Sequence, residues 1–157
     1  MTNPSRVKGR LPLALGTLCL VASACGGGAE GETQQQASVV TVPPDQNGVT
    51  ILKPLHNSKV SSPFTVEVEP TGDVVVVPLG KERKGEPSGH VHLVIDHDCI
   101  PVAQPIPVDE DWVVDLKDGS TSTQLDLPPG VHEICAQIGD AEHIALYAVS
   151  RIVVTVE

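Results

Sequence analysis

Short runs of aliphatic residues, each bounded by turn-forming residues, dominate the chain after residue 38 and restrict what it can fold into. Turn-formers such as Asn47-Gly48, Asp118-Gly119 and Pro128-Pro129-Gly130 separate the runs. The only aromatic residues besides histidine are one Trp, one Tyr and one Phe, so Val, Ile and Leu must supply the core, and such residues favour strands. The runs begin at Val39, Val49, Phe64, Val74, His90, Trp112, Thr123, His132 and Arg151.

This spacing predicts an all-β domain over residues 39–157, a single immunoglobulin-like β-sandwich that is mostly antiparallel. Apolar residues do not recur at helical period over any long stretch, and only residues 140–149 would hold a short helical turn. We find no internal repeat. The chain therefore has the length and pattern of one small β domain.

The first residues have the arrangement of a secretory signal peptide. The basic residues Arg6, Lys8 and Arg10 precede an apolar run from Leu11 to Ala24, which is shorter than the roughly 18 residues expected of a spanning helix. The segment that ends the run, Ser23-Ala24-Cys25, resembles a bacterial lipoprotein box. We therefore predict a lipoprotein signal peptide over 1–24, a lipid on Cys25 and a flexible linker over 25–38, with an ordinary cleavage site as the alternative. Either way, we expect the protein to be exported. In the lipoprotein case, we expect the lipid to be its only attachment to the membrane.

The charge of the exported part excludes several partners. All 20 acidic residues but only seven of the ten Lys and Arg residues follow Cys25, which gives a formal charge of 7 − 20 = −13. An acidic surface repels phosphate backbones and anionic head groups, which disfavours binding to nucleic acid. We expect the partner to be an envelope protein or a small ligand, with cations, basic surfaces and neutral molecules favoured.

The alternation from His90 to Asp96 predicts which side chains share a face. Val91, Leu93 and Ile95 face one way, and His90, His92, Val94 and Asp96 face the other. The two histidines are therefore expected to point away from the main apolar face.

Several segments together resemble a known family. The Gly89–Asp96 stretch, the Pro-Gly-x-His turn ending at His132 and the Gly-Asp-x-x-His motif from Gly139 to His143 are similar to an uncharacterised family of bacterial secreted domains. The similarity spans approximately residues 49–156. It implies the fold more than the function, because the family carries no assigned activity. Val91 stands where the family has the middle of three consecutive histidines, and Val113, Val114 and Asp115 replace a histidine-rich run.

Histidines and carboxylates form the main candidate site. His90 and His92, at positions i and i+2 of a strand, place both imidazoles on one face about 7 Å apart. A third ligand would be His132 or His143. Copper, zinc or nickel would suit such a site. Carboxylate ligands, or partners that orient an imidazole, would come from Asp96, Asp115 or Asp140. In the alternative interpretation, these histidines only hydrogen-bond to nearby backbone.

Two cysteines remain when Cys19 leaves with the signal peptide and Cys25 carries a lipid. In an oxidising compartment the remaining pair, Cys99 and Cys135, is expected to form a disulfide. A catalytic thiol is the competing interpretation. It is disfavoured because the acidic neighbours Asp96 and Asp98 would raise the pKa of Cys99.

The sequence identifies no catalytic residues, and no enzyme class is favoured. Ser88, Ser120 and Ser122 lack a nucleophile-elbow context. Two hypotheses remain. The first is a non-enzymatic binding or accessory module of the cell envelope. The second is a metal-binding protein that uses His90 and His92 with His132 or His143, and it requires three of these side chains to converge.

Overall fold

The computed structural model describes residues 38–157, and in this range the protein has strands and no helix. The all-β prediction is therefore confirmed. The segment predicted to allow a helical turn, 140–149, instead has a turn at its start and enters the last strand at Ala145. The nine strands are β1 (Gly48–Lys53), β2 (Ser58–Val60), β3 (Phe64–Thr71), β4 (Val75–Val76), β5 (Ser88–Ile95), β6 (Val113–Leu116), β7 (Ser122–Leu125), β8 (Gly130–Gly139) and β9 (Ala145–Val156).

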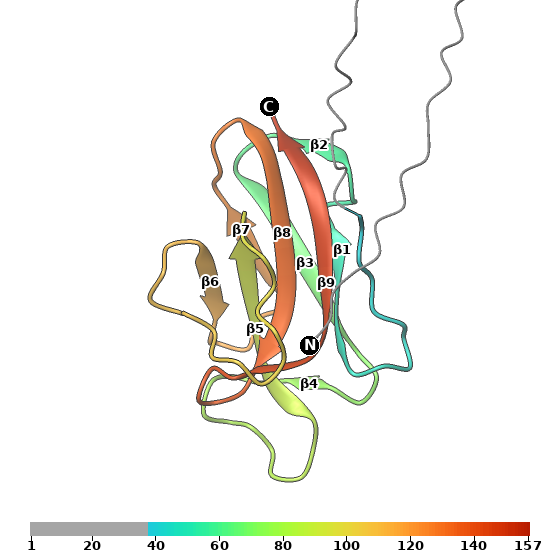
Figure 1. Cartoon of the computed structure of the whole chain (residues 1–157), viewed down its shortest axis with the longest axis vertical. Helices are drawn as coiled ribbons and strands as arrows, with labels where there is room; N and C mark the ends of the chain where they lie inside the picture. The colour runs from blue at the N-terminus through green and yellow to red at the C-terminus, as the bar shows by residue number, and fades with distance from the viewer. Residues whose placement is uncertain (1–37) are drawn as a thin grey trace, which may run out of the picture. The chain divides into compact units, whose positions relative to one another are not determined.

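Hydrogen bonds join the strands into one mixed sheet in the order β4-β5-β8-β9-β1-β3-β7, with β2 on β9 and β6 on β5. The long ladders, including β5–β8, β8–β9 and β1–β3, are antiparallel. The short pairs β4–β5, β2–β9 and β1–β9 are parallel. The sheet curls, so that β3 and β7 lie behind β5 and β8 in Figure 1. The mostly antiparallel character therefore agrees with the prediction.

The predicted immunoglobulin-like sandwich is more specific than the architecture observed. A sandwich has two separate sheets, whereas here β9 pairs with β8 and also contacts β1 through Gly48 and Ala148. This link makes the sheet continuous. The domain is thus described as one curled, mixed sheet.

The main core takes buried side chains from most of the strands, namely β1, β3, β5, β6, β7, β8 and β9. It contains Val91, Leu93 and Ile95 of β5, as the alternation predicts, and it is built almost wholly from aliphatic side chains. Phe64 is the one aromatic residue among its buried members. Burying these side chains supplies most of the favourable free energy of folding.

The opposite face of β5 is covered by the segment between β5 and β6. Val94 packs there in a second cluster with Ile106, Val113, Cys135 and Ala145. The predicted disulfide is present in this region and joins Cys99 of the covering segment to Cys135 of β8. The face that carries the histidines is therefore buried as well, although it points away from the main core.

The predicted signal peptide over 1–24 and the lipid on Cys25 lie outside the described residues, as does nearly all of the predicted linker over 25–38. Between residues 38 and 157 no helix is long and apolar enough to cross a membrane.

Candidate metal centre

Strand β5 places two imidazoles in the interior. The side chains of His90 and His92 are both fully buried, and their ring centroids are 4.4 Å apart. Because β5 lies between β8 and β6, neighbouring strands shield both of its edges at His92, which pairs with Gln137 and Asp115. The ring centroids are closer than the roughly 7 Å expected from the rise between alternate residues of a strand.

Strand β6 adds a carboxylate to the same face. Asp115 lies opposite His92 in the antiparallel register, so both side chains point the same way. Its Oδ1 atom is 3.3 Å from Nε2 of His90 and 3.7 Å from Nε2 of His92. The carboxylate therefore faces both imidazoles.

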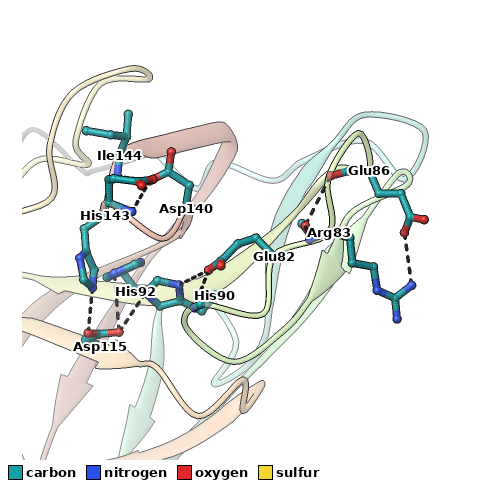
Figure 2. Close-up of polar contacts among 12 residues, drawn as sticks. Glu82, Arg83, Glu86, His90, His92, Asp115, Asp140, His143 and Ile144 are labelled. Atoms are coloured by element: carbon teal, nitrogen blue, oxygen red, sulfur yellow. Dashed lines mark hydrogen bonds and ion pairs between the residues drawn. The ribbon is translucent and has the colours of Figure 1, made fainter.

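The turn between β8 and β9 places a third imidazole, that of His143, beside Asp115. Asp140 organises this turn, since its Oδ1 accepts hydrogen bonds from the backbone N–H of Glu142 at 3.0 Å and of Ile144 at 2.8 Å. His143 has a positive φ of 57°, and its Nε2 lies 3.4 Å from Asp115 Oδ2. Figure 2 shows the His143 ring over Asp115, beside His92 and His90.

Together these residues form what we call the His/Asp cluster, which comprises His90, His92, Asp115 and His143. One ligand atom from each lies within 4.8 Å of all the others. The ring of His143 is 5.1 Å from that of His90 and 5.5 Å from that of His92, measured between centroids. Such an arrangement could hold a metal ion.

The polar atoms of the His/Asp cluster lack hydrogen bonds. Both ring nitrogens of His90 and of His92, Nε2 of His143 and Oδ1 of Asp115 are buried without a hydrogen-bond partner among residues 38–157. The contacts with Asp115 fall within hydrogen-bond or ion-pair distance but do not have hydrogen-bond geometry. Leaving such a group unsatisfied costs about 1–3 kcal/mol, so a bound cation would remove a substantial penalty.

Burial favours the metal-binding form of two of the imidazoles, those of His90 and His92. Burial lowers the pKa of His92 to about 3, and the neighbouring His90 and His143 act in the same direction. Burial also lowers the pKa of His90, although Asp115 opposes the effect. Neutral imidazole is the ligand form, so these two side chains do not need to lose a proton at neutral pH.

A glycine makes room for one of the rings. A Cβ atom at Gly139 would lie 2.6 Å from Cε1 of His92 and 3.0 Å from Cδ1 of Ile106. The Gly-Asp-x-x-His motif therefore has a physical basis, because Gly139 admits His92, Asp140 shapes the turn and His143 reaches the His/Asp cluster. The requirement at Gly139 arises from tertiary contact and has no signal in the sequence beyond the motif.

The other predicted residues lie elsewhere. His132 Nδ1 is 2.7 Å from Asp96 Oδ2 and its Nε2 is 2.8 Å from the carbonyl oxygen of Pro128. Both partners are acceptors, so both ring nitrogens donate and neither is free for a metal. Asp96 also accepts from the backbone N–H of Glu133 at 2.8 Å. The hydrogen bonds of His132 and Asp96 thus agree with the alternative interpretation, in which a histidine stabilises nearby structure and binds no metal. Asp140 binds backbone N–H groups rather than an imidazole.

Comparison with known proteins places the chain in a family. Residues 56–157 match the family described as Domain of unknown function (DUF4399). The chain belongs to this family. The match confirms the resemblance seen in the sequence, and all four members of the His/Asp cluster lie within the matched DUF4399 region. No curated protein and no solved structure matches the chain significantly.

Proposed function

We propose that this DUF4399 domain binds a divalent transition-metal ion through the His/Asp cluster. The observation that carries the proposal is the convergence of three imidazoles and one carboxylate whose buried polar atoms have no hydrogen-bond partner in the described chain. Of the two hypotheses raised by the sequence, metal binding is the one that required three histidines to converge. The residue that completes the set is His143 rather than His132.

The spacing supports binding with small side-chain movements. A tetrahedral ion at about 2.1 Å from each ligand atom places the ligand atoms about 3.4 Å apart. Asp115 Oδ1 lies 3.3 and 3.7 Å from Nε2 of His90 and His92, and its Oδ2 lies 3.4 Å from Nε2 of His143. One ligand atom from each of the four side chains lies within 4.8 Å of all the others, so a shift of about 1 Å would close the site. Imidazole with one carboxylate suits Zn(II), Cu(II) and Ni(II), and we propose Zn(II) for the first test.

The ligand count favours binding over catalysis. Four protein ligands fill a tetrahedral site, whereas catalytic zinc sites keep a position open for water or substrate. The side chains of His143 and Asp115 are 22% and 17% exposed, which gives an ion a route from solvent. We therefore propose a non-enzymatic, metal-binding accessory protein of the cell envelope.

The proposed location is extracytoplasmic. Disulfides persist in oxidising compartments, and the Cys99–Cys135 bridge supports export. We also propose that Cys25 carries a lipid that anchors the domain to the membrane. Mass spectrometry of membrane-extracted protein would test this, and a mature chain beginning elsewhere without a lipid would contradict it.

Calorimetric titration of Zn(II) and Cu(II) into the purified, tag-free, metal-depleted protein tests the function. We expect one ion per chain with micromolar or tighter affinity. His143→Ala should weaken binding at least about tenfold because it removes one ligand. His97→Ala is the matched control, since His97 is exposed and lies outside the His/Asp cluster. Absence of binding at micromolar concentration, or a His143→Ala protein that binds like the wild type, would contradict the proposal.

A further inference from the structure

The loop between β4 and β5 is fixed to both strands that carry ligands. At one end the backbone N–H of Leu79 donates to the carbonyl of Lys117, just after β6, at 2.9 Å. Further on, the backbone N–H of Arg83 donates to Oγ of Ser88, the first residue of β5, at 2.8 Å. The loop therefore has a defined position beside the His/Asp cluster.

This loop directs a second carboxylate at the cluster. Glu82 Oε1 lies 3.9 Å from Nδ1 of His90, and the Glu82 side chain is only 19% exposed. Nε2 of the same His90 ring faces Asp115 at 3.3 Å. Figure 2 shows the His90 ring between the two carboxylates. Glu82 itself is not among the residues whose ligand atoms converge.

We propose that Glu82 is a positioning and selectivity residue of the metal centre, an inference that rests on the proposed function. With a metal on Nε2, His90 would carry its proton on Nδ1, and Glu82 Oε1 would accept this N–H by moving about 1 Å closer than its present 3.9 Å. This hydrogen bond would fix the tautomer and the orientation of the ring. Metal-bound histidines commonly donate their second ring N–H to a carboxylate in this way, and loss of that partner costs about 10- to 100-fold in metal affinity.

Charge gives the same residue a second role. Asp115 and Glu82 carry two negative charges beside neutral imidazoles, and among residues 38–157 no lysine or arginine forms an ion pair with either carboxylate. A divalent ion would balance the pair, whereas a monovalent ion would leave one negative charge on two mostly buried carboxylates. Uncompensated charge at such a site is costly, so Glu82 selects divalent over monovalent ions.

The test compares Glu82→Gln with Glu86→Gln in metal-depleted protein. Glu86 is on the same loop but pairs with Arg83 at 3.2 Å, so it is a matched control. Affinities are measured by chelator competition for Zn(II) and by direct titration for Ag(I), a monovalent ion that also binds imidazole. We expect Glu82→Gln to lose about 10- to 100-fold in Zn(II) affinity, with a much smaller change for Ag(I) and none for Glu86→Gln.

Two further measurements separate positioning from folding. The thermal unfolding midpoint of metal-free Glu82→Gln should match that of the wild type, because Gln keeps the Oε1 atom that accepts the backbone N–H of Gly80 at 3.2 Å. Glu82→Asp should keep the preference for Zn(II) over Ag(I) while losing affinity, since it retains the charge but shortens the reach. Equal losses for Zn(II) and Ag(I), or wild-type Zn(II) affinity in Glu82→Gln, would overturn the inference. If the wild type itself bound no Zn(II), the proposed function would fail first.

Discussion

The absence of a side chain at Gly139 leaves the space that the His92 imidazole occupies. We predict that Gly139→Ala displaces this ring, because the added Cβ would lie 2.6 Å from Cε1 of His92. Overpacking of this kind costs about 1–3 kcal/mol, and Zn(II) affinity should fall about tenfold or more as one ligand moves. Urea unfolding and chelator competition measure the two effects. Unchanged Zn(II) affinity would contradict the prediction that Gly139→Ala displaces His92 from a metal-binding position.

His132 offers a pH-dependent contribution to stability that is separate from the metal. Burial acts to lower its pKa, but the hydrogen bonds to Asp96 and Pro128 outweigh burial and raise the pKa above its usual value. A raised pKa in the folded state stabilises the protein fully below the unfolded pKa of about 6.5, and the effect disappears as pH rises through the folded pKa.

We therefore predict that His132→Asn costs more stability at about pH 5.5 than at about pH 8.5. Urea unfolding of metal-free protein at both pH values measures the difference. A loss that is equal at both pH values, or larger at the higher one, would contradict the assignment of His132 as a protonated donor to Asp96.

At the residue scale, the sequence predicts part of the site. Strand alternation places His90 and His92 on one face, and this depends only on local geometry. The choice between His132 and His143 is not local, because it depends on the Asp140 turn and on the approach of Asp115 from another strand. The sequence does not identify Glu82, because a carboxylate in a loop cannot be assigned to a site until the position of the loop in the fold is known.

The segment between β5 and β6 closes over the His/Asp cluster and also contacts its third histidine. The backbone N–H of Ile106 in this segment donates to the carbonyl of His143 at 2.8 Å, and Cys99 ties the segment to β8. Replacing both cysteines, Cys99→Ser with Cys135→Ser, should cost about 3–4 kcal/mol because the bridge closes a long loop.

The same double variant should also bind Zn(II) more weakly, because the support of His143 is loosened. Urea unfolding and chelator competition measure stability and affinity separately. Wild-type stability would show that packing alone holds the segment. Wild-type affinity in a destabilised variant would show that the position of His143 is independent of the bridge.

The turn between β8 and β9 can be tested through its Asp140 cap. Asp140→Ala removes the acceptor for the N–H groups of Glu142 and Ile144, so we predict a loss of about 1 kcal/mol and weaker Zn(II) binding. Asp140→Asn keeps an acceptor oxygen and is the matched control, with a smaller effect on both. Equal effects of the two substitutions would indicate that charge, rather than the turn geometry, is what matters at Asp140.

At the element scale, strand positions follow well from aliphatic runs and turn residues, but pairing does not. The run at Arg151 is only the second half of β9, which begins at Ala145. The first half of β9 lacks the alternation of buried and less buried residues seen in the second half, and it is there that β9 contacts β1 through Ala148 and Gly48. This contact joins the strands into one sheet. Because it links residues that are far apart in the sequence, the sequence pattern did not reveal it, and a sandwich of two sheets was predicted instead.

For the whole molecule, charge and location agree with a role in binding cations. The chain has a formal net charge of −10, and an acidic surface raises the local concentration of cations. The disulfide is consistent with an oxidising compartment outside the cytoplasm. In the proposed extracytoplasmic location, an acidic domain with the buried His/Asp cluster would encounter metal ions from the surrounding medium.

The central claim is that three histidines and Asp115 bind one metal ion, and a crystal structure of the Zn(II)-loaded protein tests it most directly. Anomalous scattering at the zinc edge would locate the ion. We predict a single peak within the His/Asp cluster, about 2.0–2.2 Å from His90, His92, His143 and Asp115, with Glu82 within hydrogen-bond distance of His90 Nδ1. Zinc bound only at other surface positions, with the His/Asp cluster empty, would contradict the account.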